Sequence, residues 1–210
     1  MNRLIWPALG ISAMCVAACG SLFQSKVAPP TIYRLSGAAG PTAGAAAAIP
    51  VDLAVLKPSL SPGLETDRIA VLYPDRHLDY FADARWSGPL GDVLQDLAVQ
   101  EFRARANLQH VSGDASVFAS AYWLEIEVTD FQAEYPSAET APVVHVQLQA
   151  RVGNSGDRRV VGQFTARAEQ SAAANNLTSI VDAYARAADT ALADVVAHTE
   201  EVLLQNSKTR

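Results

Sequence analysis

The chain has 210 residues, of which 50% are hydrophobic and 18% charged, and its 22 acidic residues outnumber 16 basic ones to give a formal net charge of −6. This length suits one folded domain, or at most two small ones, and such a hydrophobic fraction argues against a disordered chain. The acidic balance argues against nucleic acid as a partner, because phosphate binding needs clustered basic charge, and it leaves no polybasic patch for an anionic membrane surface.

The first 18 residues have the organisation of a secretory signal peptide. Arg3 is followed by an apolar run from Leu4 to Ala18 that includes Pro7 and Gly10. One positive charge, about fifteen apolar residues and a small-residue cleavage site are typical of an export signal. A membrane-spanning helix needs about twenty apolar residues. We therefore predict that residues 1–18 are removed.

The run ends in Val16-Ala17-Ala18-Cys19, which resembles the lipobox of bacterial lipoproteins. In such a signal small residues admit the backbone to a protease cleft, and the cysteine thiol takes up the lipid. The resemblance implies a diacylglyceryl group and an N-acyl chain such as palmitate on Cys19, with no other cofactor. The alternative is a buried cysteine in an apolar helix. Gly20, rather than an aspartate, follows the cysteine, which by resemblance indicates sorting to the outer membrane, facing the periplasm.

A short tether separates Cys19 from the rest of the chain. Residues 20–30 contain turn formers and no periodicity. They span at most about 35–40 Å when fully extended. We expect a single α+β periplasmic domain over residues 31–205, close to its membrane, and a frayed tail over residues 206–210.

The first half of the domain shows short alternating segments and one helical pattern. Gly37–Ala48 is a low-complexity loop, and Ser59–Asp67 is rich in turn formers. A helix beginning at Gly88-Pro89, with Ser87 or Gly88 as its cap, places apolar residues on one face through Phe102. Strands are predicted at Thr31–Ser36, Pro50–Lys57, Arg68–Tyr73 and His77–Phe81, the last two as a hairpin.

The second half predicts a three-stranded meander and a closing helix. The strands are expected at Tyr122–Thr129, Val144–Val152 and Arg159–Ala168, each with one apolar and one polar face. On the polar face, Glu125 and Glu127 are expected opposite Arg151 or Arg159. The helix spans Asn175–Gln205, with Asn176 or Thr178 as its cap. The βαβββα order predicts an α+β fold, an antiparallel sheet with both helices packed on one face.

No pattern in the sequence points to catalysis. There is no nucleophile elbow, phosphate-binding loop or dinucleotide fingerprint. Glu125 and Glu127 resemble a carboxylate pair, but strand alternation alone explains their spacing. The histidines are not spaced as metal ligands, so we predict neither a metal site nor an enzyme: His77, His110, His145 and His198.

An aromatic cluster precedes the first helix. Tyr80, Phe81 and Trp86 lie within seven residues of one another. Such a cluster is either a corner of the core or a contact for a partner protein, since tyrosine and tryptophan are enriched in both. Both interpretations stay open at this point.

Several short motifs, in order, make the chain similar to the ABC-type transport auxiliary lipoproteins, the PqiC-like group. The chain departs from the pattern at Pro74–Leu78. The resemblance implies a non-enzymatic protein that accompanies an ABC ATPase, a permease and an MCE-domain substrate-binding protein, which move phospholipids or other hydrophobic molecules between two membranes. The motifs are Tyr33-Arg34-Leu35, Ile49-Pro50-Val51, Asp67-Arg68-Ile69, the Tyr80–Trp86 stretch, Gly88-Pro89-Leu90 and the closing helix.

The leading hypothesis is an outer-membrane lipoprotein that docks onto or caps the MCE assembly and so supports membrane integrity. Homo-oligomerisation is expected, because the MCE partner forms rings by resemblance. The contact would use the outer face or an edge of the sheet. One alternative is a carrier that binds lipid in a pocket between sheet and helices, and another is a structural or cell-wall-regulating lipoprotein. Fold alone does not decide among them.

Overall fold

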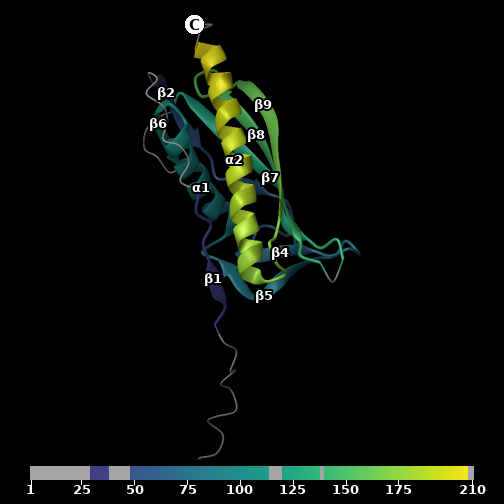
Figure 1. The fold of residues 1–210 in the computed structure, drawn as a ribbon. Coiled ribbons are helices and arrows are strands. Elements are labelled where there is room, and N and C mark those ends of the chain that lie inside the picture. Colours follow the sequence, from purple (N-terminus) through teal and green to yellow (C-terminus); the bar gives the residue numbers. More distant parts are fainter. Residues whose placement is uncertain (1–28, 38–47, 114–119, 138–139, 208–210) are drawn as a thin grey trace, which may run out of the picture.

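The computed structural model describes residues 29–37, 48–113, 120–137 and 140–207. The described residues form two helices and one mixed sheet of nine strands (Figure 1), which confirms the α+β prediction. The predicted signal peptide, Cys19, most of the tether, most of the low-complexity loop and the last three residues lie outside the described residues.

The helices and strands of the described residues have the following bounds. In chain order they are β1 (Thr31–Tyr33), β2 (Ile49–Val55), β3 (Ser59–Leu60), β4 (Arg68–Leu72), β5 (Leu78–Trp86), α1 (Leu90–Arg105), β6 (Leu108–Gly113), β7 (Tyr122–Glu134), β8 (Val143–Asn154), β9 (Val160–Ser171) and α2 (Leu177–Ser207).

Strand β7 is the centre of the sheet, because other strands pair along both of its edges. One edge pairs antiparallel with β8, and β8 pairs antiparallel with β9, as the alternation predicted. The other edge is shared by three short strands, β2, β3 and β4, all parallel to β7. Strand β6 extends the sheet beyond β2, and β5 and β1 extend it beyond β4. The sheet is therefore mixed, whereas the sequence predicted antiparallel pairing throughout.

Two strands were not predicted. The two-residue β3 lies within the turn-rich stretch, and β6 follows directly after α1. None of the side chains of β6 is fully buried. Among the described strands it pairs with β2 alone, in parallel. This strand is defined by its backbone pairing with β2, which is distant in the chain, rather than by an alternation of apolar and polar residues in its own sequence.

The predicted cap of α2 is confirmed, and the predicted cap of α1 is wrong. Asn176 accepts a hydrogen bond at its Oδ1 from the backbone N–H of Ser179 at 2.9 Å, which confirms Asn176 as the cap of α2. Helix α1 is preceded by Pro89, which makes no side-chain cap hydrogen bond, so the predicted cap by Ser87 or Gly88 is wrong. Proline suits this place because its fixed φ fits the start of a helix.

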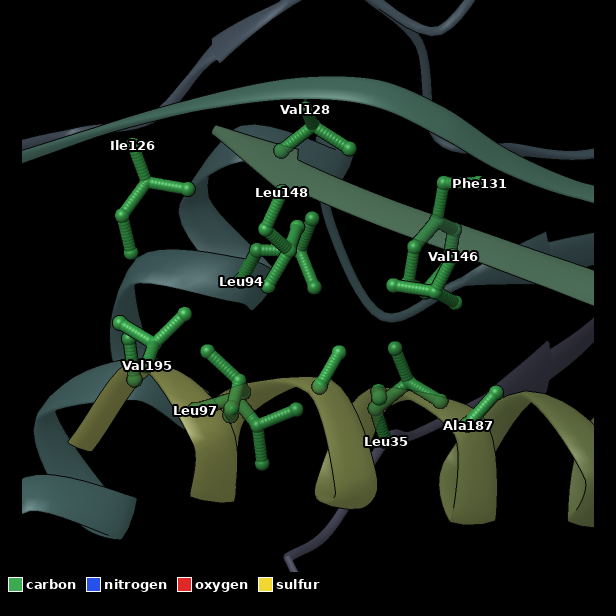
Figure 2. Packing of buried hydrophobic residues seen from close by; sticks show 14 of the residues in the cluster. Leu35, Leu94, Leu97, Ile126, Val128, Phe131, Val146, Leu148, Ala187 and Val195 are labelled. Atoms are coloured by element: carbon green, nitrogen blue, oxygen red, sulfur yellow. The ribbon is translucent and has the colours of Figure 1, made fainter. Parts of the chain in front are cut away.

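Both helices cover the same face of the sheet. Figure 2 shows Val128 and Phe131 of β7 and Val146 of β8 pointing towards the helices, where they meet Leu97 of α1 and Ala187 of α2. Helix α2 presents several fully buried small residues to the sheet, which lets the two layers lie close together: Ala183, Ala187, Ala188 and Ala191.

Three rings fill the core beside the first turns of α2. Trp86, Phe131 and Tyr184 pack against one another with ring centroids 5.2–6.1 Å apart. The Tyr184 hydroxyl donates a hydrogen bond to the carbonyl of Ala70 at 2.5 Å. Complete burial raises the pKa of Tyr184 far above its ordinary value, so the hydroxyl stays protonated and serves as a donor.

We expect Tyr184→Phe to lower the free energy of unfolding by about 1–3 kcal/mol, because it leaves the buried Ala70 carbonyl without this donor. Urea unfolding measured by far-UV circular dichroism would give the change. The matched control is Tyr135→Phe, which removes a more exposed hydroxyl bonded to Asn175 and should cost less than about 1 kcal/mol. Equal losses in the two variants would contradict the assignment.

Candidate functional site

The face of β7, β8 and β9 that points away from the helices is lined by polar side chains. No helix of the described chain packs on it, since α1 and α2 both contact the opposite, apolar face. We call it the open sheet face. Its residues alternate with core residues along each strand: Trp123, Glu125, Glu127, Asp130, Gln132, Glu134, His145, Gln147, Gln149, Arg151, Gln163, Thr165, Arg167 and Glu169.

Cross-strand contacts order these side chains. Arg151 forms an ion pair with Glu125 at 3.3 Å, which confirms the predicted pairing of Glu125. Arg167 donates to the side-chain oxygen of Gln147 at 2.5 Å, and Gln147 donates to the hydroxyl of Thr129 at 2.8 Å. These groups are all partly exposed, so each contact contributes only tenths of a kcal/mol. They hold the side chains of the face in defined positions but add little to the stability of the domain.

His145 lies near the β4 end of the open sheet face, between two carboxylates. Its ring nitrogens lie 3.4 Å from Glu169 and 3.9 Å from Glu134. The buried amide of Gln132 donates to Glu134 at 3.0 Å and to Asp130 at 3.1 Å. Among the described residues no group of His, Cys, Asp and Glu side chains is arranged to hold a metal ion. The face is acidic, with five carboxylates against two guanidinium groups.

A second exposed feature lies at the β4–β5 turn, which we call the aromatic end: Tyr73, His77, Leu78 and Tyr135. The Tyr73 ring stacks between His77, at a centroid distance of 4.6 Å, and Tyr135, at 5.7 Å. Burial, followed by proximity to Tyr73, raises the pKa of Tyr135, so its hydroxyl stays protonated and can donate to Asn175 of the loop before α2.

The turn of the aromatic end is held by its own polar groups. Asp75 accepts a hydrogen bond from the His77 ring at 2.5 Å and one from the His77 backbone N–H, and these bonds lower the pKa of Asp75. Arg76 adopts a positive φ of 67° between them. Since non-glycine residues rarely adopt this conformation, the turn has a specific geometry that its hydrogen bonds maintain.

Tyr80, Phe81 and Trp86, predicted as either core or partner-contact residues, lie in different environments. Trp86 is only 2% exposed and belongs to the core, the first of the two interpretations. Tyr80 and Phe81 are partly exposed while packing against the core. The Arg68 guanidinium lies 4.1 Å above the Tyr80 ring, and the Tyr80 hydroxyl donates to the Gly63 carbonyl. A partner contact by Tyr80 and Phe81 stays a prediction.

The ring stack of the aromatic end does not follow from the sequence pattern. The alternation predicts Tyr73 as the last residue of a strand, and no pattern points to Tyr135. The two are separated by 62 positions and meet because β4 pairs with the end of β7. No local signal links them, so only knowledge of the parallel β4–β7 pairing would have found the stack.

A buried ion-pair network joins the two helices. Glu101 is 2% exposed and accepts a hydrogen bond from Arg105 at 2.5 Å, while Arg105 also pairs with Asp189 of α2. Burial acts to lower the pKa of Arg105, but the hydrogen bonds and charges of Glu101 and Asp189 outweigh it and the pKa is raised. A Cβ at Gly37 would lie 1.7 Å from a Glu101 oxygen, so a larger residue there would force the Glu101 carboxylate to move.

A surface cavity of about 460 Å³ lies beside this network. Its walls carry hydroxyl, amide and charged groups together with a similar amount of apolar surface: Ser36, Gly37, Gln170, Asp182, Ala185, Arg186, Asp189 and Thr190. Such a lining does not suit an acyl chain, because each polar group would lose its water without a new partner.

Arg105→Met is expected to lower the free energy of unfolding by about 3–5 kcal/mol, since it leaves the buried Glu101 carboxylate without its cation. Thermal or urea unfolding would measure the loss. Arg186→Met on the exposed surface of α2 serves as the control and should change stability by less than about 0.5 kcal/mol. The double variant Glu101→Met/Arg105→Met should recover most of the loss, and a failure to recover would argue against an uncompensated charge.

Comparisons with known proteins place the fold in a family. The family model for the ABC-type transport auxiliary lipoprotein component matches residues 33–197 of this chain, from β1 into α2. The crystal structure of protein XCC0632 from Xanthomonas campestris is 26% identical, with a TM-score of 0.73 over 85% of this chain and 99% of that chain.

More distant structures share the fold. An uncharacterized protein is 13% identical with a TM-score of 0.61, covering 82% of this chain and 99% of its own. The hypothetical protein CT253 from Chlamydia trachomatis is 12% identical with a TM-score of 0.50, covering 74% of this chain and 98% of its own. A search of curated proteins gave no match. In the described part of the chain neither helix has the length and apolarity needed to cross a bilayer. Because the family model spans most of the domain, this chain belongs to the ABC-type transport auxiliary lipoprotein components.

Proposed function

We propose that this protein is an outer-membrane-anchored lipoprotein that docks onto or caps the MCE-domain component of an ABC transport system moving phospholipids or other hydrophobic molecules between the envelope membranes. Family membership over residues 33–197 is the observation that carries the proposal, and it supports a non-enzymatic, auxiliary role. The lipobox-like Val16–Cys19 segment and the short tether supply the anchor. Acyl chains on Cys19 would hold the domain stably, because each buried methylene contributes about 0.8 kcal/mol.

The open sheet face is the surface that we assign to docking. Three strands of about twelve residues give a face roughly 40 Å long and 14 Å wide, or about 600 Å² in projection. This is somewhat less than the 800 Å² or so that each partner contributes to a standard stable interface. One copy would therefore bind the partner weakly, and several copies around a ring-shaped partner would bind firmly through multivalency. This need for several copies supports homo-oligomerisation, which stays a prediction.

The charge of the open sheet face suggests the chemistry of its partner. Carboxylates outnumber guanidinium groups on this face, and the one ion pair of Arg151 among the described residues is with Glu125. Complementary charge suppresses wrong partners and speeds encounter. The partner surface is therefore expected to be basic, and binding should weaken with rising salt.

The packing between sheet and helices favours docking over the carrier hypothesis. Fully buried side chains such as Leu148, Phe131 and Ala187 occupy this space, as Figure 2 shows. An acyl chain would have to displace them, and the cavity described beside α2 is lined by polar groups. Native mass spectrometry after gentle extraction distinguishes the two functions: bound lipid in addition to the anchor would support a carrier, and a mass without it would count against one.

Site-specific photo-crosslinking in cells tests docking. A crosslinker at Thr165, exposed on the open sheet face, should yield an adduct with the MCE-domain subunit, whereas one at Asp194, exposed on α2, should not. A third probe at Tyr80 tests the contact predicted there. Recovery of only unrelated envelope proteins from all three sites would rule out the proposed partner.

The anchor has its own test. Cys19→Ala should leave an uncleaved or mis-sorted precursor, because no thiol is present to accept the lipid. Cys15→Ala, within the segment that we expect to be removed, is the matched control and should mature normally. Membrane fractionation and the mass of the mature chain would report the outcome. Normal outer-membrane fractionation of Cys19→Ala would refute lipidation.

A further inference from the structure

The domain has two distinct ends, and the chain enters at one of them. Figure 1 shows β1, β4 and β5 at the end where α2 begins, with the C-terminus of α2 at the opposite end. Helix α2 has 31 residues, so this helix alone measures about 46 Å. Thr31, the first residue of β1, pairs with Ala84 of β5. The segment that carries the proposed lipid therefore joins the domain beside the strand that leads to the aromatic end.

Large apolar side chains are exposed at two places on this end, with Ile32 opposite Arg85 and Leu78 seven residues away along β5. Ile32 of β1 is 57% exposed, Leu78 is 39% exposed, and Tyr73 is 36% exposed. Tyr73 is also held in place by ring stacking on both sides, so it loses little conformational freedom on binding. Tyrosine has an apolar ring and a polar hydroxyl, which suits the boundary between lipid headgroups and acyl chains.

The length of the tether limits how far this end can lie from a bilayer. Twelve residue steps separate Cys19 from Thr31, which corresponds to at most about 40 Å of extended chain. The end with β1 is thus the membrane-proximal end of an anchored domain. Leu204, 42% exposed near the end of α2, lies at the distal end and provides a reference position of the same residue type.

We propose that Ile32, Tyr73 and Leu78 form a second membrane contact, in which the aromatic end rests in the headgroup region of the bilayer that holds the anchor. The proposal rests on the proposed function, because it requires an acylated Cys19. The charges near the turn are mixed, with Asp75 and Asp79 alongside Arg76. The contact is therefore apolar and suits a neutral phospholipid surface, rather than an anionic one that attracts basic patches.

The contact would set the orientation of the domain. Acyl chains at the far end of a tether limit only the distance of the domain from the bilayer. A second contact formed by β1 and the β4–β5 turn would stand α2 up from the surface and turn the open sheet face sideways, towards a partner that spans the space between membranes. This orientation favours side-on docking over contact at the distal end.

A fluorescent probe placed at either end of the reconstituted lipoprotein tests the proposal. Because Cys19 would be acylated and Cys15 removed, Leu78→Cys and Leu204→Cys each provide one free thiol for the dye NBD. The labelled, lipidated proteins are inserted into phosphatidylcholine vesicles with and without lipid spin-labelled near the headgroup. Ile32→Cys is a second probe of the same end, should Leu78→Cys fold poorly.

The expected result is quenching at least about twofold stronger at residue 78 than at residue 204, since the probes lie at opposite ends of a domain whose long helix measures about 46 Å. Quenching should persist in 1 M NaCl, where the Debye length is about 3 Å. Equal quenching, no quenching, or quenching abolished by salt would overturn the apolar contact and leave the proposed function standing. Failure of the proteins to float with vesicles would overturn the anchor and the contact together.

Discussion

The close approach of α2 to β8 and β9 is the contact on which the rest of the domain depends. Four alanines give this helix a narrow buried face, and a Cβ at Gly162 of β9 would lie 2.6 Å from the Val202 side chain. Small residues on both sides therefore bring the helix onto the strands along its length. With one face of the sheet covered in this way, the opposite face is left to water or a partner, and α1 closes the remaining side through the Glu101–Arg105–Asp189 network.

The sequence predicted those parts of the fold whose pattern is local. Alternation in β7, β8 and β9 gave the meander and its inner face, and Asn176 marked the start of α2. It did not predict the parallel strands on the other edge of β7, because alternation reveals which residues are buried but not the direction of the neighbouring strand. The same distinction between local and long-range contacts applies to the candidate surfaces. The Glu125–Arg151 pair follows from strand register, whereas the Tyr73–Tyr135 stack and the Arg105–Asp189 pair join residues far apart in the chain.

The proposed function depends on surfaces of the domain rather than on a ligand-binding pocket. The described cavity beside α2 is lined by charged and polar groups as well as apolar surface, and the space between the layers is filled with side chains. What the domain offers instead is an acidic sheet face, an end with exposed apolar groups, and a chain that enters at that end. These features suit a protein that positions other components, which agrees with the auxiliary role of its family.

The order in which strands pair along β7 has a consequence for how the domain forms. Strands β2, β3 and β4 precede β7 in the chain by at least 50 residues, yet β7 is the strand that unites them into one sheet. In a chain exported from its N-terminus, as proposed, these segments would emerge before β7. The β4–β5 hairpin closes locally and β2 can pair with β6, but β3 and the β7 edge of β2 have no strand partner until β7 emerges. The C-terminal half, by contrast, contains a meander and its covering helix in sequence. We therefore expect the sheet to be completed only after β7 is present.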